Sequence, residues 1–175
     1  MPRNTRRKRA NSTIEFTLVG IPLIFTLISI FEMGRGMWIY HTMAYAIKEG
    51  TRYTVVHGDD CDPTLTANNC LVTIQNIAQR IKNAGIGLDQ NQLVLTFTSA
   101  SVGTHSCGTP STLAACLADT TTWPPAPDNV PGLPIQISGK IPFQSAIAMF
   151  WPGKTHAMGF AAVNFPATSQ ETMEF

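Results

Sequence analysis

Residues 2–31 read PRNTRRKRANSTIEFTLVGIPLIFTLISIF, which is a short basic head followed by a long apolar run. Five basic side chains and no acidic one lie within the first ten residues, and the sixteen residues from Phe16 to Phe31 carry no charge. Basic residues directly before an apolar segment hold that end of a chain on the cytoplasmic side of a membrane. We therefore predict a cytoplasmic leader at residues 1–10, followed by a membrane-spanning helix.

The span is predicted over about residues 14–33, because a bilayer crossing requires about 20 apolar residues. Glu32 and Arg35 follow at i,i+3 spacing and are expected to pair near the outer interface. Trp38 and Tyr40 come next, and amphipathic aromatic residues of this kind are typical of the headgroup level. The rest of the chain is then predicted to lie on the far side of the membrane.

The helical pattern continues beyond the apolar run and predicts one helix over residues 12–55, about 65 Å long. Its outer half is amphipathic and is expected to pack on a domain. The apolar residues of that outer face are Ile39, Met43, Ala46 and Ile47. A cleaved secretory signal is the alternative for this region, but it needs a small-x-small site after the run, and Gly34-Arg35-Gly36 is a poor one.

The charge balance of the remaining chain argues against a nucleic-acid partner. The whole chain has 12 basic and 11 acidic residues, and residues 11–175 hold seven of the basic residues and all of the acidic ones. A net negative body gives no electrostatic footprint for nucleic acid. The 12 prolines and 13 glycines instead indicate a domain rich in turns and short strands.

Two elements are predicted in the first half of this domain. Apolar residues at helical spacing predict a second helix over residues 72–84, with Asn69 as its N-cap and Gly85 just past its end. Alternating residues predict a strand over 93–98. The stretch 99–134 is expected to be irregular apart from one helical turn at residues 113–117.

The second half is predicted to contain two more strands. Alternation predicts one over residues 135–141, ended by Pro142, and another over about 157–165. A short helix is expected over 143–150, and the tail from Ser169 is expected to be frayed. The expected fold class is α+β, with a long transmembrane-to-amphipathic helix (residues 11–58) packed on a small antiparallel sheet of three or four strands in an extracytoplasmic domain (residues 59–175).

The four cysteines form two pairs with eight residues between the partners of each pair: Cys61, Cys70, Cys107 and Cys116. Four cysteines allow three connectivities. We favour Cys61–Cys70 and Cys107–Cys116, because short loops close readily. A zinc site is the alternative, but zinc-binding cysteine pairs usually have two to four residues between them.

No catalytic constellation is found in the sequence. The four histidines form no HExxH motif, and there is no GxSxG motif. The acidic stretch Asp59–Asp62 could hold calcium, but its spacing is not that of an EF-hand loop, and a solvated turn is the simpler interpretation. We therefore expect no enzymatic activity, no cofactor and no metal.

The stretch Lys8-Arg9-Ala10-Asn11-Ser12-Thr13-Ile14-Glu15-Phe16, followed by the apolar run, resembles a type IV prepilin junction. The resemblance implies cleavage by a prepilin peptidase after Ala10, which stands where the pattern usually has glycine. Asn11 would become the first residue of the processed chain, and Glu15 and Phe16 would become the fifth and sixth. It also implies that the Glu15 carboxylate pairs with the free amine of Asn11 on a neighbouring subunit.

The stretches 31–35, 48–58 and 167–172 resemble TadE-like pseudopilins of tight-adherence (Flp) type IV pilus systems. This resemblance implies a pilin-like fold and a pseudopilin or minor pilin-like subunit that is required for pilus assembly and so for cell adhesion. The implied partners are the prepilin peptidase, other pilins or pseudopilins, the pilus secretion machinery and inner-membrane lipid. The implied location is the bacterial inner membrane, with a periplasmic domain, and also the pilus itself.

Two alternatives belong to other functional classes. The first is an uncleaved single-pass membrane protein with a periplasmic binding or scaffold domain in a secretion apparatus. The second is a membrane-anchored binding module or enzyme whose contact surface is the proline-rich loop at residues 123–127. The N-terminal residue of the purified protein separates the first alternative from a processed pseudopilin.

Overall fold

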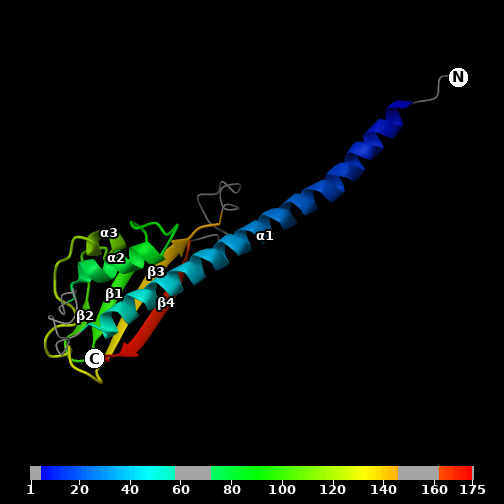
Figure 1. Ribbon diagram of the computed structural model, residues 1–175. Helices are drawn as coiled ribbons and strands as arrows, with labels where there is room; N and C mark the ends of the chain where they lie inside the picture. Colours follow the sequence, from blue (N-terminus) through cyan, green and yellow to red (C-terminus); the bar gives the residue numbers. More distant parts are fainter. Residues whose placement is uncertain (1–4, 58–71, 146–161, 175) are drawn as a thin grey trace.

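The computed structural model describes residues 5–57, 72–145 and 162–174, with side chains from Thr13 onward. Helix α1 (Thr5–Val55) projects far beyond a domain that contains a four-stranded sheet (Figure 1). The N-terminus lies at the far end of α1, whereas the C-terminus lies beside its last turn, where the Glu174 N–H donates to the Val55 carbonyl at 3.2 Å. The long helix and the antiparallel sheet confirm the predicted α+β class.

Helix α1 begins at Thr5, seven residues before its predicted start at residue 12. The basic head consists mainly of arginine and lysine, which favour helix, and it contains no glycine or proline after Thr5. Pro22 lies inside the helix, and the ribbon passes it without a break (Figure 1). A proline inside a membrane helix is tolerated because neighbouring groups satisfy the freed backbone carbonyl. The predicted end at Val55 is confirmed.

The second helix, α2 (Ile74–Ala84), starts two residues later than predicted. Its N-cap is Thr73 rather than Asn69, which lies outside the described residues. The Thr73 side chain accepts a hydrogen bond from the Asn76 N–H at 3.3 Å and thereby satisfies one of the helix's unpaired donors. Gly85 follows the helix as predicted, and its N–H donates to the Ile81 carbonyl at 2.8 Å.

The four strands are antiparallel and have the order β2-β1-β3-β4. They are β1 (Val94–Ser99), β2 (Gly103–His105), β3 (Pro134–Phe143) and β4 (Val163–Thr172). Strand β2 lies in the region that was predicted to be irregular, because three residues are too few to show a period of two. The predicted helical turn is present as α3 (Leu113–Cys116). The Phe143 end of the helix predicted at 143–150 is strand instead, and residues 146–150 lie outside the described residues.

Two predictions about the end of the chain were wrong. Pro142 does not end β3, because it pairs with Asn164 where β1 no longer flanks the strand, and a proline is tolerated at such an edge. The tail from Ser169 is not frayed: β4 (Val163–Thr172) continues beyond the predicted end at 165, and it pairs with β3 throughout. Residues 157–161 of the predicted strand lie outside the described residues. Met173 follows β4 and is buried, which anchors the C-terminal end of the chain.

One face of the sheet forms the core. Leu95 pairs with Gly139 and Phe97 pairs with Ile137, so the buried residues of β1 and β3 share that face. The predicted outer face of α1 packs against it, with Ile39 partly buried and three residues fully buried: Met43, Ala46 and Ile47. Helix α2 joins the same core through Ile74, Ile77, Ala78 and Ile81. The prediction that α1 changes from an exposed apolar helix to an amphipathic core helix is therefore confirmed.

Two glycines allow the close approach of α1 to its neighbours. A Cβ added at Gly50 would lie 2.6 Å from a side-chain carbon of Ile81, and one added at Gly139 would lie 2.6 Å from a side-chain carbon of Ile47. Both distances are well below ordinary carbon contacts of about 3.5–4.0 Å. Gly50 thus sets the crossing of α1 with α2, and Gly139 sets the depth at which α1 lies on β3.

Asp128 is a fully buried carboxylate that holds the turn between β1 and β2. Its oxygens accept hydrogen bonds from the Ser101 N–H at 3.0 Å, from the Val102 N–H at 3.2 Å and from the Ser101 hydroxyl. Burial raises the pKa of this carboxyl, but the hydrogen bonds from Ser101, Ser99 and Val102 lower it by more, so the pKa falls to about 2. Asp128 therefore stabilises the fold in its charged form.

We expect Asp128→Asn to lower the free energy of unfolding by about 1–2 kcal/mol at pH 7. Because the folded pKa of about 2 lies below the ordinary value of 3.8, the stabilisation is complete above pH 3.8 and is lost as the pH falls towards 2. Urea unfolding should therefore show nearly the same wild-type advantage at pH 7 and pH 4 and a clearly smaller one at pH 2.5. An advantage of equal size at all three pH values would contradict a role for the charge.

Candidate assembly interface

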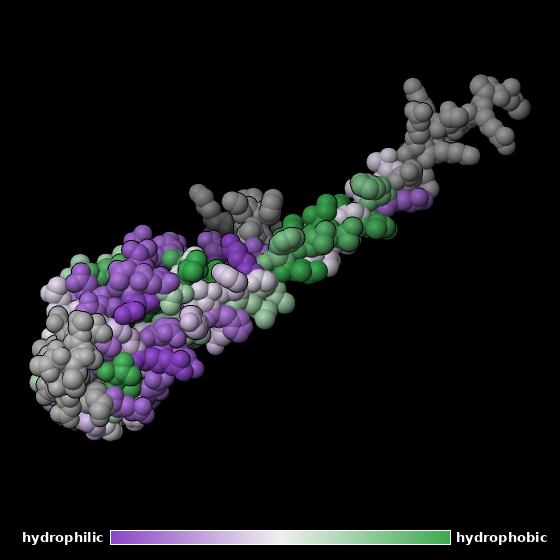
Figure 2. All heavy atoms as spheres, viewed as in Figure 1, coloured by the Kyte–Doolittle hydropathy of each residue, from purple (hydrophilic) through white to green (hydrophobic). Residues whose placement is uncertain are grey.

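The projecting half of α1 is apolar and uncovered. Among the described residues, the segment Thr13–Val55 is the one helix that is long and apolar enough to cross a membrane, and none of its most apolar stretch is buried. Figure 2 shows hydrophobic side chains along the projecting rod and mostly hydrophilic ones over the domain. Phe16 and Phe31, at the two ends of the apolar run, are each 78% exposed. This half of α1 is the candidate surface for lipid or for other helices.

The four residues of the predicted junction lie together near the start of this surface. Ala10 and Asn11 are in the second turn of α1, Glu15 follows about 6–8 Å further along the axis, and Phe16 is next to it. The Glu15 side chain is exposed in the single chain. The first buried residue of α1 is Gly36, about 32 Å from Glu15. Since a hydrocarbon core is about 30 Å thick, Glu15 would lie near the inner boundary when the domain rests on the outer one.

The base of the domain, which we define as the residues around Gly36, carries a stacked aromatic pair. The rings of Phe143 and Phe165 lie 5.1 Å apart, and both come within 3.7 Å of the position that a Cβ on Gly36 would take. Arg35 lies over the Phe143 ring at 4.8 Å and pairs with Glu32 at 3.7 Å, as the i,i+3 spacing predicted. The sequence did not predict that these two rings meet beside Gly36, because Phe143 was expected to begin a helix and Phe165 to end a strand.

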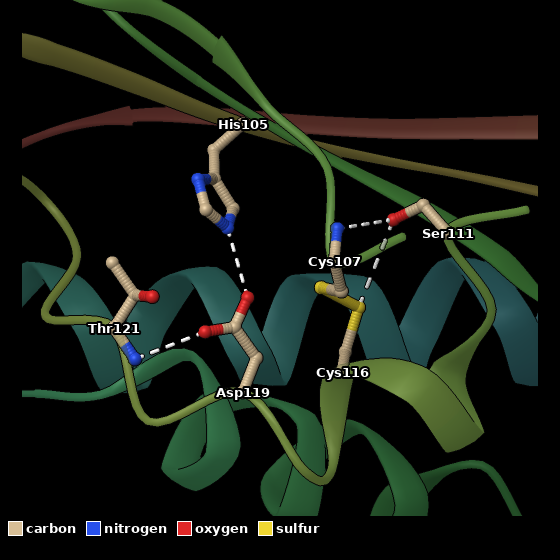
Figure 3. A network of polar contacts seen from close by, with 6 residues as sticks. All are labelled: His105, Cys107, Ser111, Cys116, Asp119 and Thr121. Atoms are coloured by element: carbon tan, nitrogen blue, oxygen red, sulfur yellow. Dashed lines mark hydrogen bonds and ion pairs between the residues drawn. A yellow bond between two sulfur atoms is a disulfide. The ribbon is translucent and has the colours of Figure 1, made fainter. Parts of the chain in front are cut away.

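A polar network holds the loop that joins β2 to α3 (Figure 3). Cys107 and Cys116 form a disulfide, the second of the two predicted bridges, and the first lies outside the described residues. The His105 Nε2 lies 2.9 Å from an Asp119 carboxylate oxygen, so β2 is tied to the segment after α3. Ser111 accepts a hydrogen bond from the Cys107 N–H at 2.9 Å. No sequence motif predicted this partner for His105.

The same network bears on metal binding. Donor atoms of His105, Cys107 and Asp119 lie within 4.8 Å of one another. A thiolate is the form of cysteine that binds metals, and the Cys107 sulfur is held in a disulfide. With the bridge closed the group therefore offers only an imidazole and a carboxylate, and it is a structural tie. Burial raises the pKa of Asp119, but the hydrogen bonds from Thr121 and His105 and the nearby His105 charge lower it by a larger amount. The net shift of the Asp119 pKa is therefore downward.

We expect the double variant Cys107→Ser/Cys116→Ser to lose about 2–4 kcal/mol of stability, because the bridge restricts the unfolded chain. The loop it closes spans a sequence separation of 9, which places the effect at the lower end of that range. Thermal unfolding of the full chain with and without a dithiol reductant measures the loss. The double variant serves as the control, since the reductant should not affect its unfolding through this bridge.

Residues 11–52 match the family model described as TadE-like protein. Over these residues α1 is similar to the TadE-like family. The match begins at Asn11, covers the exposed apolar half of α1 and ends at Arg52 within the domain-packed half, so the predicted family resemblance is confirmed over the helix. No curated protein and no solved structure matches the chain. A TadE-like helix suggests a protein associated with tight-adherence pili that interacts with other components of the pilus.

Proposed function

We propose that this chain is a pseudopilin or minor pilin-like subunit required for assembly of a tight-adherence (Flp) type IV pilus. The observation that carries the proposal is the single helix α1, whose apolar half is uncovered and whose other half is built into the domain core. Such a helix couples a membrane-embedded surface rigidly to an external domain. The TadE-like match over residues 11–52 supports this role.

The proposed assembly step depends on Glu15. After cleavage by a prepilin peptidase behind Ala10, Asn11 would carry a free α-amine, which is largely protonated near pH 7 because its ordinary pKa is about 7.7–8.0. A carboxylate in an apolar helix bundle requires a positive partner. The Asn11 amine of a neighbouring subunit provides one, so processing creates the group that assembly needs. The apolar half of α1 passes from lipid to a helix bundle with little change in hydrophobic free energy.

The proposed location is the bacterial inner membrane, with a cytoplasmic N-terminus and a periplasmic domain, before entry into a pilus. The basic head supports this orientation, since Lys and Arg stay on the cytoplasmic side. The Cys107–Cys116 bridge supports it as well, because disulfides persist in oxidising compartments such as the periplasm. The partners in this proposal are the prepilin peptidase, other pilins or pseudopilins and the secretion machinery, and the role is structural rather than enzymatic.

N-terminal sequencing of the protein from membranes and from sheared pili tests the processing step. We expect a chain that starts at Asn11 in both fractions, and a chain that starts at Met1 or Pro2 in a strain without the prepilin peptidase. A start at Met1 or Pro2 in the presence of the peptidase would reject processing and favour the uncleaved single-pass protein. Absence of pili from a strain lacking this chain, with restoration by the intact gene, tests the requirement in assembly.

A further inference from the structure

A cavity of about 470 Å³ lies at the base of the domain, between α1, the segment that joins α2 to β1, and the end of β3. Its size falls within the range of about 300–1,000 Å³ that is usual for small-molecule sites. Arg35 and Asp89 both line it, and no ion pair joins these two among the described residues. The cavity is therefore lined by a cation from α1 and an anion from the segment that joins α2 to β1.

The depth of the cavity matches the headgroup layer of a membrane that α1 crosses. Arg35 lies two residues beyond Met33, the predicted end of the span, which places its backbone about 3 Å above the hydrocarbon. The headgroup layer is about 5–8 Å thick on each side. A phospholipid beside α1 would thus place its polar group at the level of the cavity without leaving the bilayer.

The Arg35 guanidinium contacts groups from three parts of the chain. It lies over the Phe143 ring, and its Nη2 contacts both the Glu32 carboxylate and the Gln144 carbonyl. A guanidinium carries five N–H groups, and those on Nε and Nη1 have no partner within the part of the chain that the structure describes. The side chain is 48% exposed. A planar guanidinium with donors to spare suits the oxygens of a phosphate.

The Asp89 carboxylate belongs to the segment that joins α2 to β1. Its Oδ1 accepts a hydrogen bond from the Asn91 N–H at 2.9 Å, and its backbone carbonyl accepts bonds from Gln92 and Leu93, which form the turn that leads into β1. The side chain is exposed, and Oδ2 has no partner among the described residues. One oxygen thus positions the carboxylate, and the other is available to a cation.

We propose that this cavity binds the headgroup of a phospholipid that carries a primary ammonium, with its phosphate on Arg35 and its ammonium on Asp89. A primary ammonium donates three hydrogen bonds, whereas a trimethylammonium donates none, so the site prefers phosphatidylethanolamine to phosphatidylcholine. Phosphatidylglycerol has no cation for Asp89 and is the weaker ligand. The site rests on α1 as a membrane span and is independent of processing and of pilus assembly.

The test uses the full chain in nanodiscs that contain equal amounts of the three lipids, followed by native mass spectrometry of the lipids retained on the protein. We expect retention of phosphatidylethanolamine about tenfold above phosphatidylcholine, because a charge-assisted hydrogen bond discriminates between them. Asp89→Asn should abolish that preference. Arg35→Gln should lower retention of both lipids about tenfold, and Arg35→Lys should restore part of it.

The matched controls are Arg52→Gln and Glu171→Gln, which make the same kinds of change away from the cavity and should leave lipid retention unchanged. Circular dichroism of each variant verifies that it is folded, and the comparison of Arg35→Lys with Arg35→Gln separates recognition from folding. Equal retention of the three lipids by the wild-type protein would overturn the proposal. So would a wild-type preference that survives both Asp89→Asn and Arg35→Gln.

Discussion

Replacement of Glu15 by alanine is expected to leave the processed protein in the membrane at its normal level but to lower its incorporation into pili by at least about 100-fold. Removal of one partner from a buried ion pair costs about 3–5 kcal/mol, and each 1.4 kcal/mol is a factor of about ten in an equilibrium. Processing should persist, because the variant retains Ala10 and Asn11 at the junction. Quantitative immunoblots of membrane and sheared-pilus fractions measure both effects.

The controls for this prediction separate the charge from the size of the side chain. Glu15→Gln keeps the shape and loses the charge, so it should be as defective as Glu15→Ala, whereas Glu15→Asp should retain partial incorporation. Glu49→Ala removes another carboxylate of the same helix. The Glu49 side chain is 38% exposed, and its carboxylate lies 3.9 Å from the Arg52 guanidinium. Such surface pairs contribute about 0–1 kcal/mol, so incorporation should stay close to normal. Normal incorporation of Glu15→Ala would refute the proposed pairing with Asn11.

Replacement of Phe97 by alanine is expected to lower the free energy of unfolding by about 3–5 kcal/mol, because it leaves a cavity in the core. Phe97 is fully buried on β1 and packs edge-to-face against Trp123, with 5.3 Å between the ring centroids. For a chain of this size the melting temperature should fall by on the order of 10 °C. Thermal unfolding of the full chain in detergent, followed by circular dichroism, measures the shift.

Val102→Ala is the matched control for the core variant. Val102 lies in the turn between β1 and β2 and is 60% exposed, so its truncation should change the free energy of unfolding by no more than about 0.5 kcal/mol. A similar loss in both variants would show that the region tolerates no truncation, whatever its burial. A loss below about 1 kcal/mol for Phe97→Ala would contradict the assignment of this ring to the core.

The features that the sequence predicted best are those whose signal is local. The charge-free run from Phe16 to Phe31 indicates an exposed apolar helix, and the spacing of Met43 and Ile47 indicates a buried face, because burial repeats with the period of the helix. The bridge between Cys107 and Cys116 also has a local signal, because two cysteines that are close in the sequence need only a short loop to meet. Each of these predictions agrees with the structure.

Some of the candidate site residues also have a local sequence signal, whereas others are brought together only by the fold. Ala10, Asn11 and Glu15 form a contiguous motif, so a resemblance could point to them without any knowledge of the fold. Residues of the basal cavity could not be found like this, because Arg35 and Asp89 are separated by 54 positions and no period links them. His105 and Asp119 are closer in sequence, but their contact depends on a strand of three residues that leaves no pattern of its own.

By itself, the sequence determined that this protein is built on one helix that runs from an apolar, exposed half into the core of a small domain, because polarity and helical period are written residue by residue. Only the tertiary structure decided where the chain ends in the sheet. Residues 163–172 read VNFPATSQET, a largely polar stretch with a proline, of which the part up to 165 was predicted as strand and the part from Ser169 as a frayed tail. They form β4 because the open edge of β3 supplies backbone partners along their whole length, and an edge strand tolerates both the proline and the polar side chains.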